Sequence, residues 1–217
     1  MKQRVIEEIK KERLIVIVRN VKKEKLIPLA EAMYQGGIRL LEITYSADGY
    51  ISDEETAQMI HDLCEHFKDR MFIGAGTVLT KNQVALTKQA GGNFIISPNT
   101  KKEVIEAAVV YGMVSIPGAL TPSEIEDAYE FGADFVKLFP ITSLGIDYVK
   151  AIRAPLTHIP LLAVGGVDLN NIKDYLNAGI CGVGIGSNIV DKKLIEQNSW
   201  QEISCLAKQY CLEIREK

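Results

Sequence analysis

The feature that most constrains the fold is a regular alternation of short β-branched runs with amphipathic stretches along the chain. Consecutive runs begin about 20 to 30 residues apart, which is the length of one strand–helix unit. Strands are predicted at residues 14–18, 39–43, 71–74, 94–97, 113–116, 135–138, 161–164 and 181–185. Helices are predicted at residues 22–35, 54–67, 81–89, 101–111, 123–131 and 172–177.

Eight such units in 217 residues predict a (β/α)8 TIM barrel, an α/β fold in which residues 1–217 form a single domain. An extra N-terminal helix at residues 2–12 is expected to cover the bottom of the barrel. The alternative is an open doubly wound sheet, which usually carries a glycine-rich loop after its first strand. Here Arg19-Asn20 follows the first strand, so the even spacing favours the barrel.

The composition is that of an ordinary soluble globular protein, with 47% hydrophobic and 24% charged residues. A net charge of -3 and a pI of about 5.7 argue against a nucleic-acid partner and against an anionic membrane surface. The N-terminus has no apolar signal region, and no uncharged stretch reaches transmembrane length. We therefore expect no membrane contact and a cytoplasmic location.

The cysteines and histidines form neither a metal-binding nor a redox pattern. None of the four cysteines belongs to a Cys-x-x-Cys pair, and the three histidines do not share a helix face or a strand. The sequence therefore predicts no metal site and no cofactor.

Lys137 is the most informative single residue, because it interrupts the apolar run Phe135-Val136-Lys137-Leu138-Phe139-Pro140. Lysine is almost never fully buried without a reason. Burial lowers the pKa of a lysine and leaves a free amine, the nucleophile that Schiff-base chemistry on a carbonyl requires. The alternative is a lysine at a strand end whose ammonium group extends into water.

Glu42 is an acid within the apolar strand Leu40-Leu41-Glu42-Ile43-Thr44. Burial raises the pKa of a carboxylic acid toward neutrality, which suits a general acid/base. The alternative is a structural carboxylate paired with Lys137 or Arg19 inside the barrel. Pairing and catalysis are compatible.

Active sites of such barrels lie at the carboxyl ends of the strands. This rule brings Arg19 and Thr77 to the same mouth as Lys137 and Glu42, with Arg19 either an anion contact or simply solvated. Two glycine-rich turns, Gly165-Gly166 and Gly184-Ile185-Gly186-Ser187, follow the last two predicted strands. Turns at these places form the usual phosphate site of the fold. The lysine, the acid and the phosphate site together indicate a phosphorylated keto substrate, but they do not identify the reaction.

Several segments, taken in order, resemble the 2-keto-3-deoxy-6-phosphogluconate (KDPG) aldolase family, which includes 4-hydroxy-2-oxoglutarate aldolase activity. The resemblance runs from residue 14 to about residue 190. Its most specific segments are Leu41-Glu42-Ile43-Thr44, Gly74-Ala75-Gly76-Thr77-Val78 and Val136-Lys137-Leu138-Phe139-Pro140.

The resemblance implies a metal-independent class I aldolase, a carbon–carbon lyase that assembles as a homotrimer of barrels. Its substrate would be KDPG, cleaved to pyruvate and glyceraldehyde 3-phosphate, with 4-hydroxy-2-oxoglutarate as a second substrate. Lys137 would form the Schiff base and Glu42 would act as acid/base. The residues implied for binding are Arg19 and Thr77 for the carboxylate, Pro98 and Phe139 for the pocket wall, and Gly165, Gly166, Gly186 and Ser187 for the phosphate.

Two positions depart from the family pattern. Some members carry an arginine shortly after the Glu-Ile-Thr segment, where this chain has Tyr45-Ser46, so more of the anion binding falls on Arg19. Many members have threonine before the double glycine, where this chain has Val164. The change at Val164 keeps open the galactonate-derived epimer of the substrate.

Two other functions are compatible with a barrel that has a phosphate site. One is an isomerase or synthase acting on a phosphorylated sugar or heterocycle, which would not need a lysine buried in the sixth strand. The other is a non-catalytic phosphosugar-binding barrel, although no segment resembles a DNA-binding or signalling module. Pyruvate release in the presence of a chelator would distinguish the three.

Overall fold

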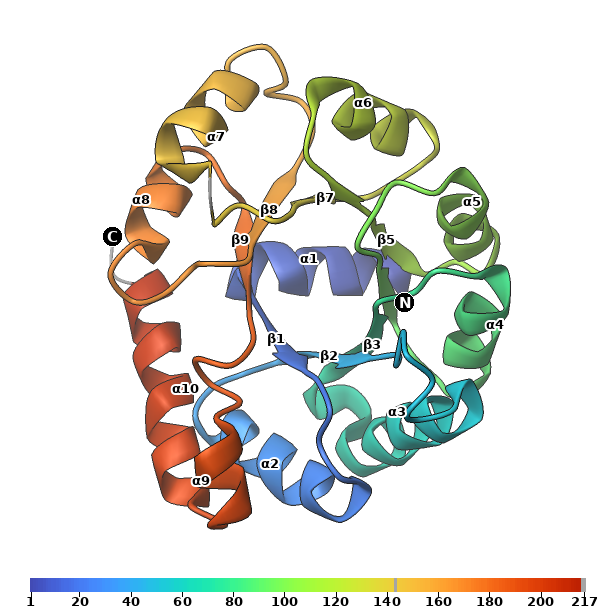
Figure 1. The fold of residues 1–217 in the computed structure, drawn as a ribbon, viewed down its shortest axis with the longest axis vertical. Helices are drawn as coiled ribbons and strands as arrows, with labels where there is room; N and C mark the ends of the chain where they lie inside the picture. The colour runs from blue at the N-terminus through green and yellow to red at the C-terminus, as the bar shows by residue number, and fades with distance from the viewer. Residues whose placement is uncertain (143, 216–217) are drawn as a thin grey trace.

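The computed structural model describes residues 1–142 and 144–215. Its strands form one sheet that curls into a barrel surrounded by helices (Figure 1). The strands are β1 (Leu14–Val18), β2 (Leu40–Thr44), β3 (Phe72–Gly76), β4 (Phe94–Ile96), β5 (Val114–Ile116), β6 (Gly118–Ala119), β7 (Val136–Leu138), β8 (Leu161–Val164) and β9 (Gly182–Ile185). The helices are α1 (Lys2–Glu12), α2 (Lys23–Gln35), α3 (Asp53–Phe67), η1 (Lys68–Arg70), α4 (Lys81–Gln89), α5 (Lys102–Val110), α6 (Pro122–Glu130), α7 (Gly145–Arg153), α8 (Ile172–Asn177), α9 (Lys192–Glu196) and α10 (Trp200–Arg215).

The sheet is parallel, with strand order β5-β4-β3-β2-β1-β9-β8-β7-β6. Its two ends, β5 and β6, are separated in sequence only by Pro117. Both lie beside β7, because Asp134 N donates to Ser115 O at 3.0 Å and Lys137 N donates to Pro117 O at 2.8 Å. Together they occupy the place of the fifth strand and close the ring. The predicted (β/α)8 barrel is confirmed, and the break falls at a proline because it has no N–H to donate.

Two apolar cores follow from the alternation of side chains along each strand. One fills the barrel, and the larger one lies between the strands and the surrounding helices. The inner core contains Ile15, Leu40, Phe72, Phe94, Ile96, Val114, Ile116, Phe135 and Leu162. Residues two positions further along a strand therefore face the same interior, nearer the carboxyl end. Lys137 follows Phe135 in this way, and Glu42 follows Leu40.

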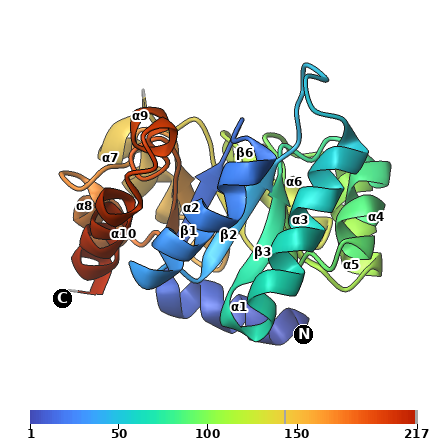
Figure 2. The ribbon, with the colours of Figure 1, turned by 90° about the horizontal axis from the view of Figure 1, so that it is seen from below.

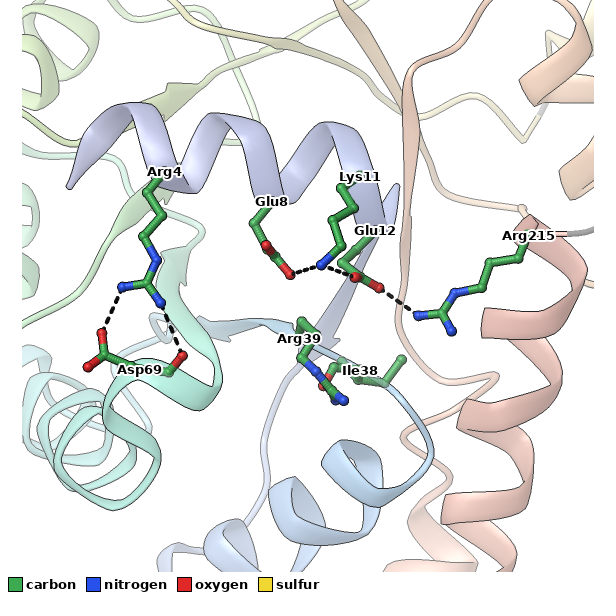
Figure 3. A network of polar contacts seen from close by, with 8 residues as sticks. All are labelled: Arg4, Glu8, Lys11, Glu12, Ile38, Arg39, Asp69 and Arg215. Atoms are coloured by element: carbon green, nitrogen blue, oxygen red, sulfur yellow. Dashed lines mark hydrogen bonds and ion pairs between the residues drawn. The ribbon is translucent and has the colours of Figure 1, made fainter.

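The helix that precedes the barrel closes its amino-terminal end, as predicted. Figure 1 shows α1 across the barrel axis and Figure 2 shows it beneath the strands. Val5 and Ile9 of α1 are buried in the inner core. Polar contacts fix the exposed side of the helix (Figure 3): Arg4 pairs with Asp69 at 2.8 Å, and Arg215 of α10 pairs with Glu12 at 3.0 Å. The carboxyl ends of the strands are thus the end left for a ligand.

Several helices begin where the sequence supplies a cap. Ser52 with Glu55, Thr80 with Gln83, and Thr121 with Glu124 each form a capping box at the start of α3, α4 and α6. Each box satisfies amide groups that a helix N-terminus leaves without partners. Among the described helices, none is both long and apolar enough to cross a membrane.

Candidate active site

Lys137 lies on the inner wall of the barrel. Its strand β7 runs between β6 and β8, with Gly118 and Leu162 as the neighbouring residues in register. The lysine is only 6% exposed, and its Nζ lies 4.4 Å from the ring centroid of Phe139. The side chain is therefore a buried amine against an aromatic face, not a lysine reaching into bulk water.

Glu42 lies on the same interior, on β2 between β1 and β3. It is 2% exposed, and its Oε2 has no hydrogen-bond partner among the described residues. A buried carboxyl oxygen without a partner costs free energy. Its free lone pairs are available to a substrate hydroxyl or to a bridging water.

The two groups are coupled electrostatically, together with Arg19. Burial lowers the pKa of Lys137 below its ordinary value; the Glu42 carboxylate opposes this effect and the Arg19 guanidinium adds to it. Burial raises the pKa of Glu42, against the influence of Lys137 and Arg19. No ion pair within 4.0 Å joins Glu42 to either cation in the described part of the chain. Burial thus shifts Lys137 toward its free amine and Glu42 toward its protonated form, while the attraction between the two charged forms opposes both shifts.

Arg19 and Thr77 meet at the rim of the barrel. Arg19 Nη2 donates to Thr77 Oγ1 at 3.5 Å. Thr77 has φ of 56°, in the left-handed region that a β-branched residue rarely adopts. Strained residues of this kind are concentrated at functional sites. The contact places a guanidinium and a hydroxyl together at the carboxyl ends of β1 and β3.

A cavity of about 600 Å³ opens beside Arg19. Seven of the eleven residues predicted for the site border it, namely Arg19, Phe139, Val164, Gly165, Gly166, Gly186 and Ser187. Gly165 and Gly166 have φ of 89° and 75°, conformations that glycine adopts without strain. The cavity therefore connects the phenyl ring beside Lys137 to both glycine turns.

Two asparagines that the sequence did not single out hold these turns. Asn171 Nδ2 donates to Gly166 O, and Asp168 N donates to Asn171 Oδ1, both at 2.9 Å. Asn188 Nδ2 donates to Val167 O at 3.2 Å and so ties the second turn to the first. Asparagine is a common turn residue, and this was the only sequence signal for either role.

Val164 and Pro98 take different places. Val164 lines the cavity at the end of β8, and its Cγ2 would lie 2.8 Å from a Cβ on Gly184. Pro98 follows β4 and does not border the cavity. Its carbonyl oxygen lies against Gly118, only 2.4 Å from where a Cβ would stand, and Gly118 is the register neighbour of Lys137. Pro98 is therefore near the lysine strand rather than near the glycine turns.

Tyr45 and Ser46, which follow the Glu-Ile-Thr segment, supply no cation to the site. The Tyr45 hydroxyl is buried against Thr87 Oγ1 at 2.9 Å and Gln83 O at 3.2 Å, and burial raises its pKa to about 12. Ser46 Oγ donates to Asp48. Among the described residues, no group of three or more histidine, cysteine, aspartate or glutamate side chains is placed to hold a metal ion.

A buried lysine beside a buried carboxylic acid, at the mouth of a barrel with a glycine-lined cavity, defines a class I aldolase, which works through a Schiff base. The chain belongs to the KDPG and KHG aldolase family, whose model matches residues 5–206.

Individual relatives cover nearly the whole chain. The 2-dehydro-3-deoxy-phosphogluconate aldolase of Haemophilus influenzae is 33% identical over 211 residues, 95% of each protein. The 2-dehydro-3-deoxy-6-phosphogalactonate aldolase of Escherichia coli is 33% identical over 91% of this chain and 94% of its own. A crystal structure of KDPG aldolase from Legionella pneumophila, with pyruvate captured as a covalent carbinolamine intermediate, superposes with a TM-score of 0.82 at 31% identity, over 91% of this chain and 93% of that one.

Proposed function

We propose that the protein cleaves 2-keto-3-deoxy-6-phosphogluconate to pyruvate and glyceraldehyde 3-phosphate, with Lys137 as the Schiff-base lysine. The observation that carries the proposal is a buried amine with a lowered pKa, placed beside an unpartnered buried acid. The carbinolamine that pyruvate forms in the Legionella relative supports the same chemistry here.

The reaction begins when the free amine of Lys137 attacks the C2 ketone of the substrate. The carbinolamine loses water and leaves a protonated imine at C2. Burial serves this step because it keeps a larger share of the lysine unprotonated near neutral pH. Phe139 bounds the space around Nζ on one side.

The imine then acts as an electron sink for the C3–C4 bond. Glu42, directly or through one water, removes the proton of the C4 hydroxyl, and the electrons of the C3–C4 bond move into the enamine. Glyceraldehyde 3-phosphate leaves. The enamine is protonated at C3, and hydrolysis of the resulting imine releases pyruvate and restores Lys137.

Substrate orientation comes from the two ends of the site. Arg19 and Thr77 bind the carboxylate, and the turns at Gly165-Gly166 and Gly186-Ser187 bind the phosphate. Both turns border the same cavity as Arg19, and two asparagines fix their backbone. Holding both ends of the substrate orients the breaking bond with no contact to it.

The galactonate-derived epimer, 2-keto-3-deoxy-6-phosphogalactonate, is the second candidate substrate. Val164 favours it as an additional substrate, because an apolar wall at the cavity offers no hydrogen bond by which to choose between C4 hydroxyl configurations. The Escherichia coli relative named for that epimer supports the same reading. 4-Hydroxy-2-oxoglutarate, in which a carboxylate replaces the distal phosphate, is the third candidate.

A coupled assay for pyruvate release, run with both C4 epimers and with 4-hydroxy-2-oxoglutarate, tests the proposal. We expect turnover of both epimers that survives prolonged treatment with a chelator. Loss of activity on chelation that a divalent metal restores would contradict the Schiff-base mechanism. Absence of pyruvate from all three substrates would favour a phosphosugar isomerase, a synthase or a binding protein.

The same proposal includes a single barrel domain over residues 1–217, a homotrimer and a cytoplasmic location. One continuous sheet and the packing of α10 against α2 support the single domain. The homotrimer and the cytoplasmic location are inferred from membership of the family. Sedimentation equilibrium of the purified protein tests the trimer, and fractionation of the native cell tests the location.

A further inference from the structure

Of the described residues that line the 600 Å³ cavity, two are cationic, Arg19 and Lys192. They come from opposite ends of the chain, one from the end of β1 and the other from the start of α9. Arg19 donates a hydrogen bond to Thr77, and its positive charge lowers the pKa of both Lys137 and Glu42. Its guanidinium therefore belongs to the reacting end of the cavity.

Lys192 lines the cavity together with the glycine turns, and it is not among the charges that shift the pKa of Lys137 or Glu42. Lys192 and Ile195 of α9 both line the cavity, and their spacing of three residues places them on one face of the helix. Asn188, in the turn before α9, lines the cavity as well. The neighbouring Lys193 is also exposed but does not line the cavity. Only the first of these two adjacent lysines is placed to meet a ligand.

The described residues around Lys192 leave its ammonium group available to bind an anion. Asp191 is the acidic residue among those that line the cavity, and its Oδ1 already accepts the amide of Leu194 at 2.9 Å. Lys192 has no ion pair or side-chain hydrogen bond with any described residue. An exposed lysine that lines the same cavity as the glycine turns matches a phosphate dianion.

We propose that Lys192 is a cationic contact for the distal phosphate of the substrate, and that it selects for substrates with a distal dianion. This inference rests on the proposed function. It assigns the two cations of the cavity to different ends of the substrate: Arg19 binds the carboxylate and Lys192 binds the phosphate. The backbone of the glycine turns does not require a lysine or a positive charge at position 192. Lys192 therefore sets substrate specificity and is not needed for the turns to fold.

The test compares kcat/KM for the phosphorylated substrate with kcat/KM for its dephosphorylated counterpart. In Lys192→Ala this ratio should fall about fivefold, the size of an exposed charge contact. Lys193→Ala is the matched control and should keep the wild-type ratio, while Lys192→Arg should retain most of it. The fall should diminish at high ionic strength, because salt screens exposed charges.

Equal ratios in Lys192→Ala and Lys193→Ala would overturn the proposal, as would a fall that does not respond to salt. Calorimetric titration with inorganic phosphate provides a test that needs no turnover. Weaker phosphate binding in Lys192→Ala than in Lys193→Ala supports the assignment even if the wild type fails to release pyruvate from KDPG, which would reject the proposed function alone. Equal phosphate affinity in the two variants would reject the role of Lys192 while leaving the aldolase proposal intact.

Discussion

Glu42 occupies the space that a side chain on Gly76 would need. A Cβ built on Gly76 would lie 1.6 Å from Oε1 of Glu42 and 2.3 Å from its Cδ. The two residues belong to adjacent strands, β2 and β3, and both strands are fully buried. The absence of a side chain at position 76 therefore makes room for the acid inside the barrel.

Gly76→Ala should displace the Glu42 carboxyl group and lower turnover by about a hundredfold or more, the effect of losing a general acid/base. Gly74→Ala is the matched comparison, because its Cβ would instead lie 2.2 Å from the ring of Phe94. That variant should lower the free energy of unfolding by about 1–3 kcal/mol, as overpacked cores do. Pyruvate release and denaturant unfolding measure the two effects. Wild-type turnover in Gly76→Ala would contradict the steric argument.

Glu42→Gln should still form the imine but release pyruvate about a hundredfold to ten-thousandfold more slowly. The amide keeps the shape of the acid and cannot exchange a proton with the C4 hydroxyl. Trapping of the imine, measured beside steady-state turnover, separates the two steps. A loss of less than about tenfold would assign the proton transfer to another group.

The rate of imine formation with saturating pyruvate should rise with pH through a midpoint below the ordinary lysine pKa of 10.5, since burial lowers the pKa of Lys137. Only the unprotonated amine attacks, so the rate falls below that midpoint. Glu42→Gln removes a carboxylate that raises the pKa of Lys137, and should move the midpoint to lower pH. Arg19→Met removes a cation that lowers it, and should move the midpoint to higher pH. Rapid quenching with borohydride measures the profiles, and shifts in the same direction would rule out this electrostatic coupling.

Val164→Thr should shift the ratio of the two C4 epimers toward the gluconate-derived substrate. Threonine has nearly the shape of valine but adds a hydroxyl that can hydrogen-bond the substrate, and such contacts discriminate more strongly than an apolar wall. The ratio of kcat/KM for the two epimers is the measurement. If the wild type strongly rejects one epimer and the substitution leaves the ratio unchanged, Val164 is only a packing residue.

The barrel and the catalytic pair were predictable because each leaves a local signal. Charged residues at positions 42 and 137 break apolar runs, and the rule that parallel strands end at one face brings them together. The alternation of inward and outward side chains fixes their direction as well. The break of the fifth strand was also visible in principle, as Pro117 lies within the extended stretch.

The supporting contacts were not predictable, because they depend on register and turn conformation. The clearance between Gly76 and Glu42 exists only when β2 and β3 pair as they do. Asn171 and Asn188 act through carbonyl groups whose directions are set by the left-handed glycines of the neighbouring turn. Lys192 looks in the sequence like any lysine on a surface helix, and only the cavity distinguishes it from Lys193.

The central claim is that Lys137 forms an imine with the substrate ketone, and reductive trapping tests it most directly. The protein is treated with pyruvate and borohydride, digested, and analysed by mass spectrometry, with Lys150→Ala as a control at an exposed lysine. We predict inactivation, a pyruvate-derived adduct on the peptide that contains Lys137, and neither adduct nor turnover in Lys137→Ala. An adduct at another lysine, or full activity in Lys137→Ala, would contradict the account.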